Sequence, residues 1–83
     1  MDFETAAAQV KSLKTSPSND ELLELYGLYK QATTGDNNTS KPWVDPKGRA
    51  KWEAWEGRKG MSQDDAKAAY IEVVQTLLAK YPH

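Results

Sequence analysis

Apolar residues recur at helical spacing in four segments of this 83-residue chain, and no segment shows the alternation typical of a β-strand. The four segments are residues 2–14, 18–35, 45–60 and 62–82. Between the second and the third lies a stretch, 36–44, that is rich in Asn, Ser and Thr and reads as a long loop. The pattern therefore predicts an all-α fold with four helices, in one domain over residues 1–83.

Start and stop signals support each of these helices. Asp2 can cap the first helix, and Ser18 with Glu21 has the spacing of a capping box at the start of the second. Asp45 followed by proline suits the start of the third helix, and Ser62 with Asp65 resembles a capping box for the fourth. The second helix is expected to stop at Gly35 and the third at Gly60.

The apolar stripes of the four helices predict the core. Gly27 lies inside the second helix, where it should cost about 1 kcal/mol relative to alanine. The expected core positions, in chain order, are Phe3, Ala6, Ala7, Val10 and Leu13, then Leu22, Leu25, Tyr26 and Tyr29, then Ala50, Trp52 and Trp55, and finally Ala66, Ala69, Tyr70, Val73, Leu77 and Tyr81.

Composition argues against several classes of function. The net charge of −1 lacks the basic excess of a nucleic-acid binder. There is no cysteine, and His83 is the only histidine, so no thiolate, histidine-based catalytic site or metal site is expected. No apolar run approaches the ~20 residues of a membrane span, and the polar start does not resemble a secretory signal. We expect a cytoplasmic monomer that needs no cofactor and is not stably inserted in a membrane.

Candidate functional residues lie on both sides of the long loop. Tyr26 and Tyr29 either pack in the core or form an aromatic wall beside Lys30, which shares a helix face with Tyr26. The cations Lys30, Lys47, Arg49 and Lys51 form either a solvated face or a phosphate cradle. Trp43, in the loop, could be a surface anchor or a lid over an apolar site.

Three stretches together resemble one known family. They are "LYGLYKQATTGD", "KGRAKWEAW" and "KGMSQDDAKAAYIEVV", and their order and spacing are similar to those of the acyl-CoA-binding protein family across nearly the whole chain. The resemblance implies an up-down-down-up four-helix bundle without enzymatic activity. It also implies a carrier and pool former for long-chain fatty acyl-CoA thioesters, with transient contacts to enzymes that use them.

The resemblance also implies a binding site. Tyr26, Tyr29 and Lys30 match the family's contacts to the nucleotide and its 3'-phosphate, and Lys51 matches a further phosphate-binding lysine. The remaining matched positions near the ligand are Ala7, Lys11, Lys47 and Tyr70. Trp43 stands where the family usually has glycine.

Two other classes compete with a carrier. The first is a protein-interaction module whose exposed aromatic residues, Trp43 included, dock a partner. The second is an enzyme that consumes acyl-CoA, which is disfavoured because the chain has no recognisable arrangement of nucleophile and base.

Overall fold

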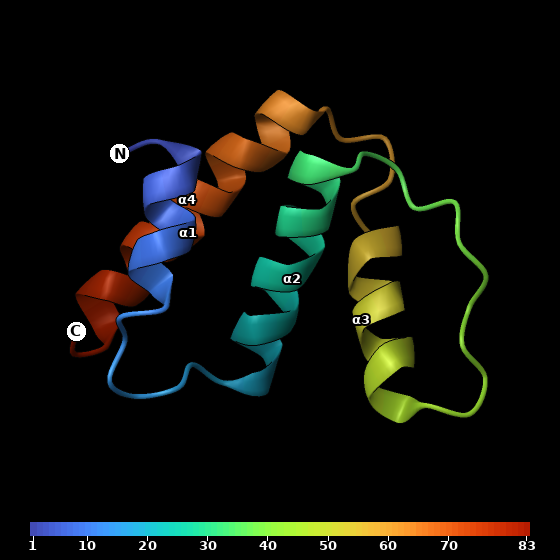
Figure 1. The fold of residues 1–83 in the computed structure, drawn as a ribbon, viewed down its shortest axis with the longest axis horizontal. Helices are drawn as coiled ribbons and strands as arrows, with labels where there is room; N and C mark the ends of the chain where they lie inside the picture. Colours follow the sequence, from blue (N-terminus) through green and yellow to red (C-terminus); the bar gives the residue numbers. More distant parts are fainter.

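Four α-helices form the computed structural model, which describes residues 1–83 and confirms the all-α prediction. They are α1 (Phe3–Val10), α2 (Asn19–Thr33), α3 (Pro46–Glu56) and α4 (Gln63–Lys80). Figure 1 shows that α1 and α4 run in one direction and α2 and α3 in the other, which is the up-down-down-up arrangement. α2 lies centrally and packs against both α3 and α4, whereas α1 packs against α4.

The predicted capping residues make their expected hydrogen bonds. The Asp2 carboxylate accepts from the Thr5 N–H at 2.7 Å. At α2 the capping box is complete, because the Glu21 N–H donates to the Ser18 hydroxyl and the Ser18 N–H donates to the Glu21 carboxylate. At α4 only half of a capping box forms, in which the Asp65 N–H donates to the Ser62 hydroxyl at 3.0 Å. These local bonds fix where the helices begin.

Two helices end earlier than predicted. α1 stops at Val10 instead of residue 14, because the chain then bends so that the Lys14 N–H can donate to the Pro82 carbonyl. α3 stops at Glu56 instead of Gly60, and the residues between them continue as tighter turns. Gly60 has a φ of +92°, a conformation that glycine adopts readily and that directs the chain into α4.

The core differs from the predicted stripe of α2. The buried cluster is made of Phe3, Ala6, Leu25, Leu28, Ala32, Ala66, Tyr70, Val74 and Leu77. Leu22 and Tyr29 were predicted to belong to it, but they are 45% and 42% exposed. The reason is that α2 has neighbours on two sides, so the face carrying Leu25, Leu28 and Ala32 is covered while the Leu22–Tyr29 edge stays open.

The backbones of α2 and α3 approach each other closely at Gly27. A Cβ atom at this position would run into the backbone carbonyl of Ala54 in α3. The glycine that weakens α2 as an isolated helix therefore permits the two helices to lie in contact.

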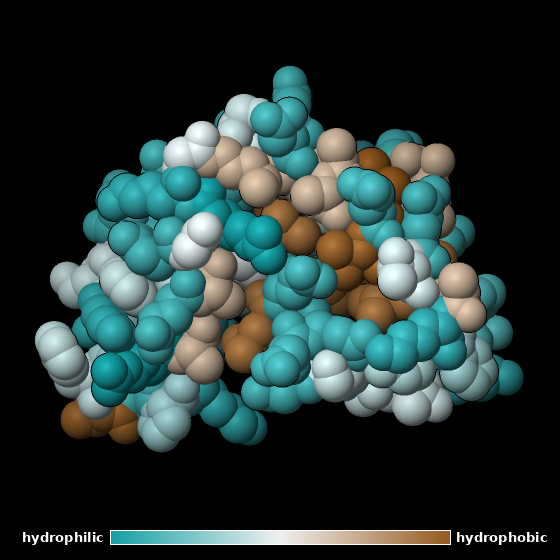
Figure 2. Space-filling view, turned by 180° about the vertical axis from the view of Figure 1, so that it is seen from behind, coloured by the Kyte–Doolittle hydropathy of each residue, from teal (hydrophilic) through white to brown (hydrophobic).

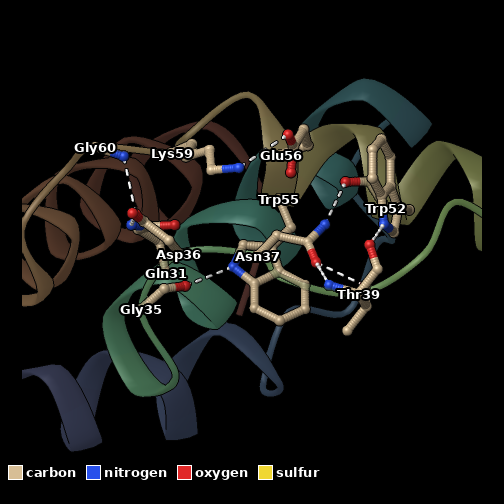
Figure 3. Close-up of polar contacts among 10 residues, drawn as sticks. All are labelled: Gln31, Gly35, Asp36, Asn37, Thr39, Trp52, Trp55, Glu56, Lys59 and Gly60. Carbon is tan, nitrogen blue, oxygen red and sulfur yellow. Dashed lines mark hydrogen bonds and ion pairs between the residues drawn. The ribbon is translucent and has the colours of Figure 1, made fainter.

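A polar cluster around the buried Gln31 side chain joins the C-terminal end of α2 to the turn between α3 and α4 (Figure 3). The Gln31 amide is fully buried and donates to the Asp36 carboxylate and the Met61 carbonyl, each at 2.8 Å. The same Asp36 oxygen accepts from the Gly60 N–H at 2.9 Å. The bond from Gly60 is the largest cause of a lowered pKa of Asp36, and the bond from Gln31 is the next. Together the bonds hold the turn before α4 against α2.

Tryptophans hold the long loop onto α3, as Figure 3 also shows. The Trp55 indole N–H donates to the Gly35 carbonyl at 2.8 Å, and the Trp52 indole N–H donates to the Thr39 carbonyl at 3.0 Å. The buried Asn37 carbonyl oxygen accepts from the Thr39 backbone and hydroxyl. Because both ends of this stretch are bonded, the loop follows one path beside α3.

A second polar cluster joins the opposite end of α2 to the C-terminal end of α4. The Glu21 carboxylate accepts from the Tyr81 hydroxyl at 2.7 Å and from the Lys80 ammonium at 3.0 Å. These bonds and the one from the Ser18 N–H lower the pKa of Glu21 to about 2, with the Tyr81 bond the largest cause. The capping residue of one helix therefore also fixes the end of another.

Replacing Glu21 with glutamine should reduce the pH dependence of stability. The folded-state pKa lies below the ordinary value, so the ionised carboxylate stabilises the fold above about pH 4.5, and this contribution fades as pH falls toward about 2. Urea unfolding of wild type and Glu21→Gln should therefore give midpoints that differ most near neutral pH and converge in acid. Tyr81→Phe removes the largest cause of the lowered Glu21 pKa, so in that background the effect of Glu21→Gln should vanish at a higher pH. If the midpoints of wild type and Glu21→Gln differed by the same amount at every pH in this range, the lowered pKa of Glu21 would be contradicted.

Candidate ligand-binding site

A hollow opens between α1 and α2, with α4 contributing its floor. Its volume is about 410 Å³. The lining is mostly apolar and aromatic and consists of Ala7, Val10, Lys11, Leu22, Leu25, Tyr26, Tyr29 and Tyr70. Five of the eight residues expected at a site lie here, from three different helices. The exposed edge of α2 that departs from the predicted core forms one wall of this hollow.

A second hollow lies between the first turns of α2 and α3. Its volume is about 400 Å³, and it is lined by Asn19, Leu22, Leu23, Tyr26, Pro46, Lys47, Ala50 and Lys51. Leu22 and Tyr26 line both hollows, so the two adjoin along α2. Together these two hollows make up a groove along α2 that Tyr26 lines on both sides.

Three aromatic rings pack together beside the first hollow. Phe3, Tyr29 and Tyr70 have ring centres 5.0 to 5.9 Å apart and come from α1, α2 and α4. Tyr70 is only 4% exposed, and burial raises the pKa of its hydroxyl, with neighbouring Tyr29 adding to the rise. The hydroxyl therefore stays protonated near neutral pH and can donate a hydrogen bond. Tyr29 and Tyr70 line the hollow directly, and Phe3 packs against both of them from outside the lining.

Lysine amines surround the groove. The Lys51 ammonium lies 5.5 Å from the centre of the Tyr26 ring, while Lys11 lines the first hollow and Lys47 the second. Lys30 lines neither hollow; its ammonium lies 4.8 Å from the centre of the buried Trp55 ring. The structure therefore groups seven of the eight expected residues along the groove and places Lys30 one helical turn beyond Tyr26.

Several apolar lining residues were not predicted as part of the site. Leu22 and Leu25 were expected only as core, Leu23 was not singled out, and Ala50 was expected only in the apolar content of α3. The large exposed fraction of Leu22 is a signal that appears only after folding. An apolar groove flanked by amines suits a ligand with an anionic head and an apolar tail.

A third hollow, on the other side of α2, has a different character. It has a volume of about 340 Å³ and lies between α2 and α4, with Leu28, Val73 and Leu77 among its lining. Glu21, Glu24 and Glu72 also line it, with Arg58 as the one cation. On the face of the molecule seen from behind, Figure 2 shows hydrophobic residues recessed among hydrophilic ones. The third hollow combines both kinds of residue in the same way. Its acidic lining does not suit an anion.

The structure contains neither a cluster of metal ligands nor a membrane-spanning helix. No three His, Asp or Glu side chains gather in a way that could hold a metal ion. None of the four helices has the length and apolar character needed to cross a bilayer.

Comparison with known proteins finds a family model and curated relatives that cover most of the chain. Residues 1–74 match the family model described as acyl CoA binding protein. The chain is 60% identical over 82 residues to acyl-CoA-binding protein homolog 1 of Caenorhabditis elegans, covering 98% of this chain and 95% of the relative. It is 59% identical over 80 residues to the acyl-CoA-binding protein of Saccharomyces cerevisiae, covering 95% and 92%.

Solved structures agree with this. The crystal structure of acyl-CoA-binding protein 2 from Oryza sativa superposes with a TM-score of 0.88 at 44% identity, covering 94% of this chain and 88% of that one. The solution structure of the yeast acyl coenzyme A binding protein gives a TM-score of 0.77 at 57% identity, covering 98% and 95%.

Proposed function

The chain belongs to the acyl CoA binding protein family, and from this premise we propose that it binds a long-chain fatty acyl-CoA thioester along the two adjoining hollows. Proteins of this family are acyl-CoA binders and not enzymes. The observation that carries the proposal is the position of Tyr26, which lines both hollows and has the Lys51 ammonium over its ring.

The nucleotide end of the ligand fits the region around Tyr26, Lys30 and Lys51. An adenine ring can stack on a tyrosine, an interaction worth about 1–3 kcal/mol in nucleic-acid sites. The amines of Lys30 and Lys51 come from α2 and α3, which lie side by side, so both can approach one phosphate. Ala7, Lys11, Tyr29 and Tyr70 would then surround the rest of the headgroup in the first hollow.

The acyl chain fits the second hollow. Leu22, Leu23 and Ala50 offer apolar surface there, and the Lys47 stem can add to it while its amine stays in water. Each buried CH₂ contributes about 0.8 kcal/mol, so a long chain gains several kcal/mol over a short one before ordering costs.

We propose a cytoplasmic, monomeric carrier that keeps acyl-CoA as a bound pool and releases it to enzymes that use it.

Calorimetric titration of palmitoyl-CoA, hexanoyl-CoA, free CoA and palmitate tests this proposal. Palmitoyl-CoA should bind one to one and more tightly than each of the other three, because only it offers both the phosphorylated head and the long tail. Equal affinity for palmitate and palmitoyl-CoA would remove the nucleotide site from the proposal. Failure of palmitoyl-CoA to bind would refute the function itself.

A further inference from the structure

Two apolar side chains project into solvent from the loop before α3. Trp43 is 78% exposed and Val44 is 95% exposed, the highest values among the large hydrophobic residues. Neither lines any of the three hollows. Trp43 is therefore a surface residue and not a lid over the groove. Transfer of both apolar side chains out of water and into contact with another apolar surface would be favourable.

The structure holds this Trp43–Val44 tip in place. On its N-terminal side the loop is bonded to α3 through Thr39 and Trp52, and the Lys41 ammonium lies 3.8 Å from the Glu53 carboxylate. On its C-terminal side Asp45 caps α3. The tip is thus a fixed protrusion at one end of α3, so little conformational freedom would be lost on docking.

Basic residues surround the tip. The segment 41–53 carries Lys41, Lys47, Arg49 and Lys51 against two acidic residues, Asp45 and Glu53, in a chain whose net charge is −1. The Arg49 guanidinium lies 5.9 Å from the centre of the Trp43 ring. The segment that carries the two most exposed apolar side chains is therefore net positive, and one of its cations lies beside the Trp43 ring.

We propose that the Trp43–Val44 tip docks reversibly on an anionic lipid bilayer. Tryptophan favours the interface between headgroups and acyl chains, and nearby lysine and arginine residues are attracted to anionic headgroups. A convex tip of two side chains suits a soft bilayer better than a protein partner, whose specific interface buries about 800 Å² on each side. With so few anchoring groups the contact is weak and reversible.

Docking would give the proposed carrier access to its ligand. The second hollow is lined by Pro46 and Lys47, which are separated from the tip only by Asp45, so a docked tip brings that hollow near the lipid surface. An acyl-CoA whose tail lies in the bilayer could then pass into the groove. This last step depends on the proposed function, whereas docking itself does not.

Cosedimentation with vesicles tests the docking. Wild-type protein should sediment with phosphatidylcholine vesicles that contain phosphatidylserine and much less with phosphatidylcholine alone, and salt should release it. The Trp43→Ser/Val44→Ser variant should have a partition coefficient lower by about tenfold or more, because the apolar surface is removed. Wild type that stays in the supernatant with both vesicles, or a double variant that sediments like wild type, would overturn the proposal.

A matched pair of charge reversals tests the basic surround. Arg49→Glu should weaken vesicle binding by about tenfold. Lys59→Glu is the control, because Lys59 is also exposed and also pairs with a glutamate of α3, Glu56, but lies outside the tip. Equal loss in both variants would show that only the net charge of the protein matters, and would overturn the assignment to this surface.

Palmitoyl-CoA calorimetry separates this inference from the proposed function. The Trp43→Ser/Val44→Ser variant should bind palmitoyl-CoA in solution as wild type does, because neither Trp43 nor Val44 lines the groove. Vesicle binding by a wild type that does not bind palmitoyl-CoA would refute the carrier alone. Normal palmitoyl-CoA binding without any vesicle binding would refute the docking alone.

Discussion

Replacing Trp55 with alanine should lower the free energy of unfolding by about 3–5 kcal/mol, the usual cost of truncating a large buried aromatic residue. Trp55 is only 6% exposed, and its indole N–H donates to the Gly35 carbonyl at the end of α2. The change would leave a cavity between α2 and α3 and deprive that carbonyl of its donor. Urea unfolding followed by circular dichroism measures the effect as a lower midpoint.

Two other variants make this prediction specific. Trp55→Phe keeps most of the buried ring and loses the hydrogen bond, so it should cost less, about 1–3 kcal/mol, and still fold. Trp43→Ala removes the same kind of side chain from a position that is 78% exposed, and it should change stability by less than about 0.5 kcal/mol. If Trp55→Ala and Trp43→Ala unfolded at the same urea concentration, burial at Trp55 would not be what stabilises the α2–α3 contact.

Features that depend on neighbouring residues could be predicted from the sequence. Helix starts belong to this class, because a cap such as Ser18 with Glu21 is satisfied within one turn of chain. The four helices and the loop before α3 follow from periodicity and composition in the same way. Periodicity does not show how wide a face of α2 the neighbouring helices cover. Leu22 and Tyr29 were therefore predicted in the core, although both side chains are exposed.

Features that depend on contacts between distant residues could not be predicted. Gly27 reads as a local defect of α2, and only the position of the Ala54 carbonyl shows that a side chain has no room there. α1 was predicted four residues too long, because the bond from the Lys14 N–H to the Pro82 carbonyl holds the segment after α1 against the C-terminal end of the chain. In both cases the tertiary contact outweighs the local preference.

The candidate site falls between these two classes. Residue patterns alone left Tyr26 and Tyr29 undecided between core and site, and the assignment came from the resemblance of whole stretches to a family. The structure then brings Ala7, Lys11 and Tyr70 to the same hollow as these tyrosines, although they lie on three helices. The position of Lys30 over Trp55 has no sequence signal, because both rotamers are set by the packing of α2 on α3.

Removing Lys30 and Lys51 together should abolish the contribution of the 3'-phosphate to ligand binding. If both amines hold that phosphate, wild type should bind palmitoyl-CoA about tenfold or more tightly than it binds 3'-dephospho-palmitoyl-CoA. The reason is that a hydrogen bond to a charged group contributes about 1.5–3 kcal/mol. The Lys30→Ala/Lys51→Ala variant should bind both ligands equally, at an affinity near that of wild type for the dephosphorylated form. Calorimetry with both ligands and both proteins completes the cycle.

This design separates a phosphate site from a general effect of positive charge. Lys14→Ala/Lys59→Ala removes the same charge from residues that line none of the hollows, so it should retain the full preference for the 3'-phosphate. Tyr26→Ala should weaken both ligands by a similar factor, because the Tyr26 ring would contact the base and not the phosphate, whereas Tyr26→Phe should weaken neither substantially. If the Lys30→Ala/Lys51→Ala variant still preferred palmitoyl-CoA as strongly as wild type does, the phosphate would lie elsewhere. Lys11 and Lys47, the remaining amines along the groove, would then be the residues to replace.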